Sequence, residues 1–329
     1  MILFKYLITF NGNAFLLMKY PITLLFSLLL IVACQAQDQR PFSGIDYPME
    51  VQYAELDNGQ TVAFHESGAA DETLILIHGL GSYMPAWKMN IDSFSESYRV
   101  IALDLPGYGK STKSADDYTL PFFAESVTLL MDKLDIEQSA IAGHSMGGQI
   151  ALYLAATYPD RVTKLILSAP AGFEQFTDQD QMAFQATVSP AGIAATPETM
   201  IRQNATATFY SFPAEAEFMI EDRISMTAEP GFNDYAEAQA ESIFAMLKTP
   251  VWDMMPEIEQ STLVVFGAQD ALIPNRYLHP GLSVEDVARQ GTERLPNATL
   301  KLIDNAGHFV HLEKSGEFND AVLEFLNQN

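Results

Sequence analysis

A Gly-x-Ser-x-Gly sequence at residues 143–147 contains the residue with the clearest capacity for chemistry, Ser145. Chance alone gives such a sequence in about one chain in ten of this length, so its setting matters more than its match. It directly follows an apolar run at 140–142 and precedes a helical stretch at 148–157. A tight strand-to-helix turn needs small neighbours and exposes the serine oxygen beside a helix N-terminus. The setting predicts a nucleophilic Ser145, against the alternative of a serine that only caps the helix.

A serine hydroxyl is a poor nucleophile at neutral pH and needs a base, usually a histidine that a carboxylate orients. Asp270 lies just beyond an apolar run at 263–266, and His308 follows a candidate strand at 299–303. Both residues therefore come at the carboxyl ends of strands, where open α/β sheets place their sites. The chain order is Ser, Asp, His.

The sequence offers other candidates for both the acid and the base. Asp253, in a loop before the strand at 263–266, is a second candidate acid, and His311 becomes the base if its loop is offset. We expect His78 to be structural or to line a wall. The remaining histidines lie in a hairpin, in the serine turn and in a Pro-flanked loop: His65, His144 and His279.

The elements that position these residues alternate along the chain from about residue 49. Short apolar runs, continuous rather than alternating, are typical of strands buried on both faces of a mostly parallel sheet. They lie at 74–77, 100–103, 140–142, 165–167 and 263–266. The stretches 51–56 and 61–65 flank an Asn-Gly turn and predict an opening hairpin. A terminal helix follows from apolar spacing at Phe318, Val322, Phe325 and Leu326.

The strand signal disappears between residues 173 and 250. This segment has helical spacing and is too long for a loop, so it predicts a helical insertion. It carries twelve acids against Arg202, Arg223 and Lys248, a balance of 3 − 12 = −9. It also holds fifteen Phe, Tyr and Met residues, of which we expect most to form its own core and some to face the cleft. We therefore expect the cleft to bind an apolar substrate group. We also expect the negative charge to disfavour anionic substrates, unless Arg202 or Arg223 points into the cleft.

Composition excludes several classes of protein. The chain has 329 residues, 48% of them hydrophobic and 18% charged, which is typical of a globular protein. Its formal net charge of 18 − 42 = −24 disfavours nucleic acid as a partner. The single cysteine, Cys34, excludes an intramolecular disulfide and a cysteine-cluster metal site.

Taken together, these motifs resemble the α/β-hydrolase family from about residue 50 to the C-terminus. The landmarks are the sequences at 76–81 and 104–111, the turn at 143–147, and the turns that hold Asp270 and His308. The resemblance implies an α/β fold: a mostly parallel eight-stranded sheet with helices on both faces and an inserted helical cap. The implied domains are a hydrolase core at 49–172 and 251–329 and a cap at 173–250.

The family's pattern, carried over by position, implies the role of each site residue. Ser145 is the nucleophile, His308 the general base and Asp270 its orienting carboxylate. The backbone N–H groups of Leu80 and Met146 form the oxyanion hole, and no cofactor or metal is implied. The expected function is that of a carboxylesterase or lipase-like enzyme, which cleaves small-molecule uncharged esters with an apolar acyl or aryl group through an acyl-enzyme.

Two other functions remain open. C–C bond hydrolases of ring-cleavage products share this arrangement, but usually have Asn before the nucleophile and Trp after the catalytic histidine. This chain has His144 and Phe309 at those positions. The second alternative is a non-catalytic ligand receptor on the same fold. Loss of a residue of the Ser-Asp-His triad would favour this function. Relatives that are dehalogenases or epoxide hydrolases use Asp in place of Ser145.

The N-terminal residues 1–33 contain two lysines, no acid and a 12-residue apolar stretch at 22–33. This length suits an export signal rather than a membrane span of about 20 residues. The stretch ends in Ile-Val-Ala before Cys34, which resembles the lipobox of bacterial lipoproteins; an uncleaved anchor is the alternative. We therefore expect a signal peptide at 1–33, lipid on Cys34, a tether at 34–48 and a location in the bacterial cell envelope, facing the periplasm. Translation starts at Met1 or Met18.

Overall fold

An eight-stranded sheet forms the centre of the part of the chain that the computed structural model describes, residues 42, 44–113, 117–249 and 251–328. The predicted signal peptide, Cys34 and the tether residues 34–41 lie outside these residues. In sequence order the strands are β1 (Gln52–Glu55), β2 (Thr61–Ser67), β3 (Thr73–Ile77), β4 (Arg99–Leu103), β5 (Ser139–His144), β6 (Val162–Ser168), β7 (Ser261–Gly267) and β8 (Ala298–Ile303).

The strands lie in the order β1-β2-β4-β3-β5-β6-β7-β8. The six strands from β4 to β8 run parallel, whereas β2 is antiparallel to both of its neighbours. Central strands such as β3 are buried along their whole length, which explains their continuous apolar runs. The predicted mostly parallel, eight-stranded α/β fold is confirmed.

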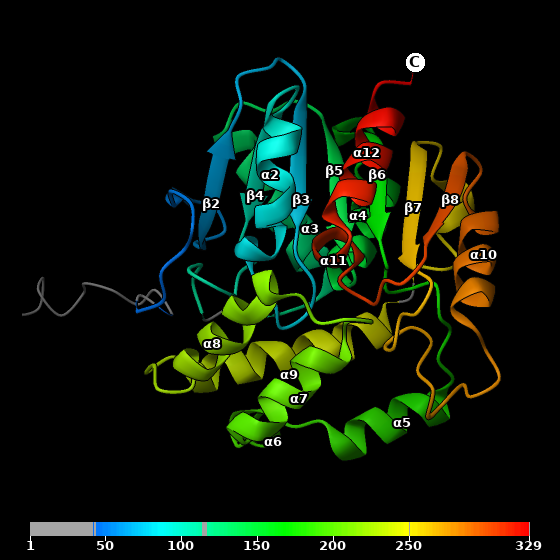
Figure 1. Cartoon of the computed structure of the whole chain (residues 1–329). Helices are drawn as coiled ribbons and strands as arrows, with labels where there is room; N and C mark the ends of the chain where they lie inside the picture. The colour runs from blue at the N-terminus through cyan, green and yellow to red at the C-terminus, as the bar shows by residue number, and fades with distance from the viewer. Residues whose placement is uncertain (1–41, 43, 114–116, 250, 329) are drawn as a thin grey trace, which may run out of the picture. The chain divides into compact units, whose positions relative to one another are not determined.

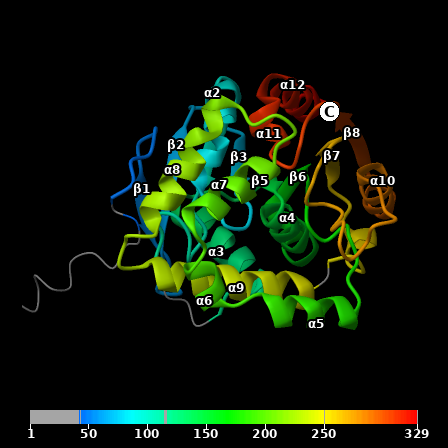
Figure 2. The same cartoon turned by 60° about the horizontal axis from the view of Figure 1, so that its bottom comes forward.

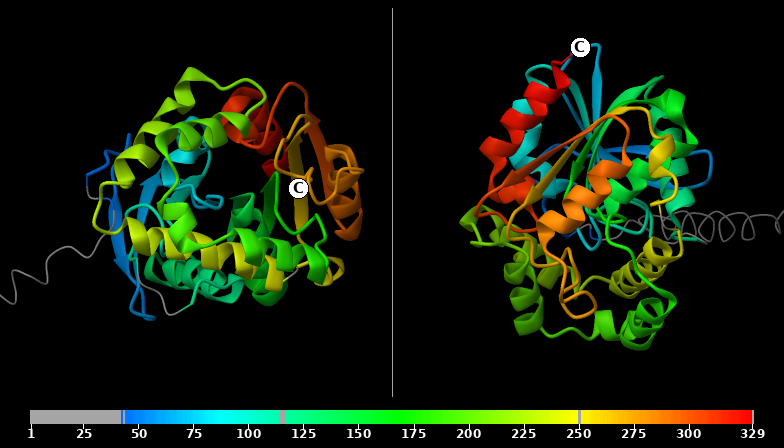
Figure 3. Two further views of the ribbon diagram at one scale, coloured as in Figure 1. Left: turned by 90° about the horizontal axis from the view of Figure 1, so that it is seen from below. Right: turned by 90° about the vertical axis from the view of Figure 1, so that its right-hand side faces the viewer.

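Helices cover both faces of the sheet. On one face the helices α2 (Lys88–Ser95), α11 (Val310–Glu313) and α12 (Ser315–Leu326) bury residues such as Phe94 and Phe318 against the strands. On the other face α3 (Leu120–Lys133), α4 (Met146–Thr157) and α10 (Val284–Arg294) bury residues such as Phe123 and Ile150. The right-hand view of Figure 3 shows helices on both sides of the sheet.

The chain between β6 and β7 forms five helices, which we call the cap. They are α5 (Asp178–Thr187), α6 (Pro190–Ala194), α7 (Glu198–Ala207), α8 (Glu217–Met226) and α9 (Phe232–Lys248). Single-turn 3-10 helices occur at η1 (Met84–Trp87), η2 (Pro159–Arg161), η3 (Ala214–Ala216) and η4 (Met255–Glu257). The cap gathers at the edge where the parallel strands end (Figure 1), and α9 runs alongside α5 and α6 (Figure 2). Within the described residues, no helix combines the length and apolar character needed to cross a membrane.

The packed structure begins earlier than the predicted boundary at residue 49. Phe42 and Ile45, within the predicted tether, are buried in the main hydrophobic core. The ring of Phe42 meets Tyr235 of α9 edge-on, with centroids 5.3 Å apart. Isolated apolar residues in a polar stretch have no periodicity, so the sequence pattern did not mark them as core residues.

We predict that Phe42→Ala lowers the free energy of unfolding by about 3–5 kcal/mol, because it removes a fully buried aromatic side chain. Urea unfolding of the purified protein measures this loss. Tyr277→Ala is the control, since that ring is 89% exposed, and we expect it to change stability by less than about 0.5 kcal/mol. Equal stabilities for Phe42→Ala and the control would show that the chain before residue 49 is not part of the core.

Candidate active site

Ser145 lies in the tight turn between β5 and α4, with φ 52° and ψ −116°. This left-handed conformation is uncommon for a residue other than glycine. Its own N–H donates to the carbonyl of Ser168 at 2.9 Å, and its carbonyl accepts from the N–H of Ala171 at 3.0 Å. Cβ atoms at Gly143 and Gly147 would overlap backbone carbonyls, those of Gly147 and Ile77 respectively. The two glycines therefore let α4 begin directly against the sheet and hold Ser145 at the edge of the strands.

His308 and Asp270 come together from the loops after β8 and β7. Nδ1 of His308 donates to Oδ2 of Asp270 at 2.8 Å, and both side chains are buried. The other oxygen of Asp270 accepts from the backbone N–H groups of Leu272 and Ile273, at 2.8 and 3.0 Å. The carboxylate is thus fixed on both oxygens. Nε2 is the ring nitrogen of His308 that remains for chemistry.

The rival acid and base lie elsewhere. The side chain of Asp253 is 92% exposed and its nearest cation is Arg294, at 3.8 Å. His311 is buried against the ring of Trp87, with centroids 4.3 Å apart, and its Nδ1 lies 3.3 Å from Ser168 Oγ. Burial and the nearby His308 lower the pKa of His311 to about 3. His311 is therefore a neutral core residue at neutral pH, and the structure pairs His308 with Asp270.

Ser145 and His308 line one cavity of about 330 Å³ between the sheet edge and the cap. Its apolar wall consists of Leu80, Ala171, Phe176, Phe184, Ile243, Met246, Leu247, Leu272 and Ile273. Of the fifteen Phe, Tyr and Met residues of the insertion, Phe176, Phe184 and Met246 line it. The polar lining is Gln149, Glu174, Gln175, Gln181 and Asn275, so no Lys or Arg of the described chain contributes to the wall. In that same part of the chain, no group of three or more His, Cys, Asp or Glu side chains is arranged to hold a metal ion.

The two candidate oxyanion donors lie near Ser145. Leu80 lines the cavity, and Met146 is the first residue of α4. Across the described residues, neither N–H donates to a protein acceptor. A helix N-terminus also carries partial positive charge, which favours an oxyanion there.

His78 fixes the loop that carries Leu80. Its Nδ1–H donates to the carbonyl of Gly79 at 2.8 Å, and its Nε2 accepts from the N–H of Leu105 at 3.0 Å. Burial lowers the pKa of His78 to about 4, so the ring is neutral at pH 7. Asp104 secures the adjoining turn, where its carboxylate accepts from the backbone N–H groups of Met84 and Lys110. Both side chains therefore hold backbone loops, and His78 takes the structural role that was one of its two expected roles.

Two residues that the sequence did not single out hold the His308 loop. His144 donates its Nε2–H to the carbonyl of His308 at 3.1 Å. The carboxylate of Glu313 accepts from the N–H of Gly307 at 2.7 Å and from the N–H of Ser211 in the cap at 2.6 Å. Nothing in the sequence marks a helical glutamate for this role, because its partners are backbone groups from segments far apart in the chain.

The fold and these motifs together define the class of protein. A family model described as the alpha/beta hydrolase fold matches residues 72–315, and the chain belongs to this family. A solved structure of a probable hydrolytic enzyme from Pseudomonas aeruginosa has a TM-score of 0.78 and 26% identity, covering 88% of this chain and all of that one. Several proteins similar to this chain are named as hydrolases, which supports its assignment as a hydrolytic enzyme.

Two relatives illustrate the range of activities in the family. A 2-hydroxy-6-oxononadienedioate/2-hydroxy-6-oxononatrienedioate hydrolase from Paraburkholderia phymatum is 30% identical, over 81% of this chain and 91% of that protein. A dihydrolipoyllysine-residue acetyltransferase component of an acetoin cleaving system, from Cupriavidus necator, is 28% identical over 84% of this chain. This chain matches 68% of that component's length, so the similarity concerns a part of it.

We predict that His311→Phe flattens the dependence of stability on pH. The folded pKa of about 3 lies below the ordinary value of 6.5, so between these values only the unfolded chain binds this proton. The wild type therefore loses about 1.4 kcal/mol of stability per pH unit as pH falls below 6.5, and the variant lacks this contribution. Urea unfolding at pH 6.0, 5.5 and 5.0 gives the two slopes.

Buried acids such as Asp104, whose pKa is raised to about 6, change stability with pH in the opposite direction in both proteins, so only the difference between the slopes is diagnostic. Equal slopes would contradict the assignment of His311 as a buried neutral residue.

Proposed function

We propose that this protein is a serine hydrolase of uncharged carboxylic esters, with Ser145, His308 and Asp270 as its catalytic triad. The observation that carries the proposal is the shared cavity. Ser145 and His308 both line it, and His308 is bonded to Asp270 on the side away from its free nitrogen. Membership of the α/β-hydrolase family supports the same assignment.

The reaction follows from these positions. Ser145 Oγ attacks the ester carbonyl while His308 Nε2 takes the hydroxyl proton, and Asp270 stabilises the imidazolium that forms. The N–H groups of Leu80 and Met146 receive the oxyanion, each donor lowering the barrier by about 3 kcal/mol. His308 then protonates the leaving alcohol. Water, activated by the same nitrogen, releases the acid from the acyl-enzyme.

The charge of the cavity favours an ester over an anionic substrate. Glu174 is the charged residue of its polar lining, and the two cap arginines bind elsewhere. Arg202 pairs with Glu217 at the surface, and Arg223 lies over the rings of Phe232 and Tyr235. A carboxylate in this cavity has no cation to receive it, which carries a large desolvation cost. The alternative that Arg202 or Arg223 binds a carboxylate in the cleft receives no support.

A C–C bond hydrolase is the second candidate, because the Paraburkholderia relative has that kind of activity in its name. The substrate in that name is a dicarboxylate. In this chain His144 precedes the nucleophile and Phe309 follows the catalytic histidine, unlike the usual Asn and Trp of that group.

We predict that a neutral p-nitrophenyl butyrate is hydrolysed with a kcat/KM at least a hundredfold above that for cleavage of 2-hydroxy-6-oxo-6-phenylhexa-2,4-dienoate. Desolvation of the substrate carboxylate without a cationic partner is the physical reason. Spectrophotometric assays of both reactions with the same enzyme preparation make the comparison. Faster cleavage of the dienoate would identify a C–C bond hydrolase instead.

We predict that Ser145→Ala abolishes esterase activity, with a fall of about 10⁶-fold in turnover, and also abolishes labelling by a fluorophosphonate probe. The variant retains the fold, since the serine side chain is small. Ser225→Ala, an exposed serine on α8, is the matched control and keeps both activity and labelling. Thermal unfolding of all three proteins verifies folding. A wild type that neither reacts with the probe nor hydrolyses esters would favour the non-catalytic receptor.

We further propose that the protein is exported and anchored in the bacterial cell envelope through lipid on Cys34, facing the periplasm. The short apolar stretch at 22–33, its two upstream lysines and the position of the single cysteine support this. Several acyl chains on one cysteine give stable membrane binding, whereas one chain gives only marginal binding.

We predict that Cys34→Ser abolishes incorporation of labelled palmitate and moves the protein out of the membrane fraction. Expression of both proteins in a bacterial host, followed by fractionation and mass spectrometry, tests this. A wild type with an intact residue 1 and a free thiol would refute lipidation.

A further inference from the structure

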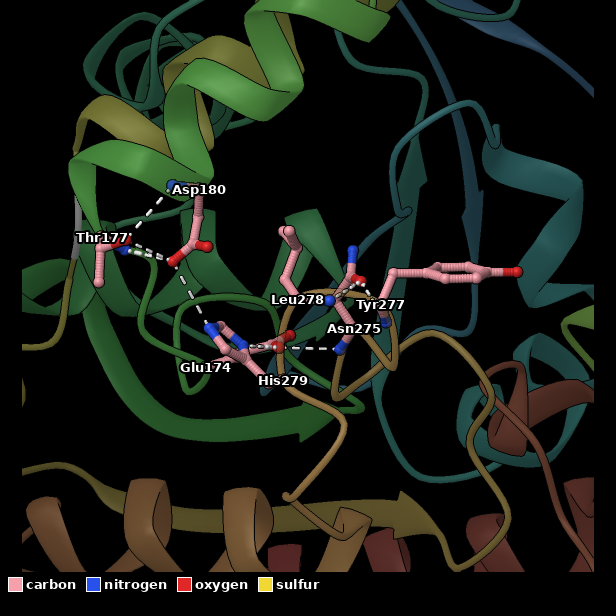
Figure 4. Close-up of polar contacts among 7 residues, drawn as sticks. All are labelled: Glu174, Thr177, Asp180, Asn275, Tyr277, Leu278 and His279. Atoms are coloured by element: carbon pink, nitrogen blue, oxygen red, sulfur yellow. Dashed lines mark hydrogen bonds and ion pairs between the residues drawn. The ribbon is translucent and has the colours of Figure 1, made fainter.

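Glu174 places a carboxylate in the wall of the cavity, on the segment between β6 and α5. Its side chain is 5% exposed. One oxygen, Oε1, accepts from Nδ1 of His279 at 2.5 Å and from the N–H of Asn275 at 2.8 Å (Figure 4). The other oxygen, Oε2, has no donor within hydrogen-bond distance among the described residues. One half of the carboxylate is thus fixed and the other half is free.

The fixed half is held from a second side. Nε2 of His279 lies 3.6 Å from Oδ2 of Asp180, in the first turn of α5 (Figure 4). That carboxylate also accepts from the backbone N–H of Thr177 at 2.8 Å and from its hydroxyl at 2.7 Å. His279 therefore sits between two acids, and the orientation of Glu174 is set before any ligand arrives. A preorganised acceptor loses little conformational freedom on binding.

The unpaired oxygen of Glu174, Oε2, can accept a hydrogen bond that the protein does not supply. Burial raises the pKa of Glu174, while its bonds to His279 and Asn275 lower it. Oε2 is not one of the fully buried polar atoms that lack a partner, so this unpaired acceptor is accessible to a donor on a ligand. Glu174 lines the same cavity as Ser145 and His308.

We propose that Glu174 Oε2 is a specificity subsite that accepts a hydrogen bond from a hydroxyl or ammonium group of the substrate and rejects substrates with a carboxylate at that position. This inference rests on the proposed esterase function and narrows its substrate class. The preferred esters are those that carry a hydrogen-bond donor away from the scissile carbonyl, within an otherwise apolar chain. His279 and Asn275 are positioning residues for this subsite.

Three esters of equal length test the subsite: pentyl butyrate, 4-hydroxybutyl butyrate and 4-(butanoyloxy)butanoate. They share the acyl group and differ at the far end of the alcohol, which is a methyl, a hydroxyl or a carboxylate. In the wild type we expect the hydroxyl ester to have about tenfold higher kcat/KM than the methyl ester, as for a hydrogen bond to a charged acceptor. We expect the carboxylate ester to be at least tenfold worse than the methyl ester. Titration of released butyrate measures all three.

The variant Glu174→Gln keeps the size of the side chain and removes its charge. We expect it to reduce the hydroxyl preference to about twofold and to improve the carboxylate ester at least tenfold relative to pentyl butyrate. Glu237→Gln, an exposed acid of α9, removes the same charge outside the cavity and should leave both ratios unchanged. Ratios in Glu174→Gln that equal those of the wild type would overturn the subsite while leaving the esterase function in place.

A binding measurement separates this inference from the proposed function. In the Ser145→Ala background, ligand-observed NMR gives the affinity ratio of the hydroxyl ester to pentyl butyrate without turnover. A hydroxyl preference that Glu174→Gln removes supports the subsite even if the wild type hydrolyses no ester. The same affinity ratio in Ser145→Ala and in the double variant Ser145→Ala with Glu174→Gln would overturn the subsite. Circular dichroism of Glu174→Gln verifies that the fold is unchanged.

Discussion

The conformation of one backbone residue, Ser145, is the constraint on which the site depends. A left-handed φ at a residue other than glycine costs on the order of 1–3 kcal/mol and persists only where its surroundings enforce it. Here the enforcing contacts are backbone hydrogen bonds to the segment after β6 and the close approach of α4 to β3 and β5 at Gly143 and Gly147. Any larger side chain at either glycine would push α4 outward. Ser145 and Met146, the proposed nucleophile and oxyanion donor, would then shift together, because they are consecutive residues.

The cap also bonds to three loops that border the cavity. The N–H of His308 donates to the carbonyl of Thr208 at 2.7 Å, after α7. The hydroxyl of Tyr235 on α9 donates to the carbonyl of Gly81 at 2.9 Å, beside the oxyanion loop. At the third loop, His279 lies between Glu174 and Asp180 at the start of α5. Movement of the cap would therefore be transmitted to the base, the oxyanion donors and the cavity wall through separate contacts.

Much of the fold followed from the sequence because its signals are local. Continuous apolar runs marked the central strands, and the glycines around Ser145 marked the turn that the structure contains. The pairing of His308 with Asp270, rather than with Asp253, followed from their positions after strands of one sheet. Because the carboxyl ends of parallel strands meet at one edge of the sheet, these expectations needed no side-chain packing.

The residues that escaped prediction are those whose roles depend on distant partners. Phe42 is a single apolar residue that becomes core only because Tyr235, in the cap, packs against it. Glu313 looks like any exposed helical acid, yet it accepts from backbone groups of two separate loops. Glu174 lies in an irregular segment between β6 and α5 in which no periodicity distinguishes a wall residue from a solvated one. Each case requires the relative placement of segments that the sequence pattern leaves free.

The charge of the molecule shows how local geometry refines an argument from composition. The sequence carries a net charge of −24, with −9 in the insertion, and this balance alone disfavours anions. Exposed charges are screened beyond about 8 Å at physiological salt, so such a bias acts mainly on encounter. Glu174 acts inside the cavity, where the lower dielectric weakens screening and strengthens every interaction with charge. Because no Lys or Arg among the described residues shares that wall, we expect one oriented carboxylate to exert more control over which substrate binds than the many acids at the surface.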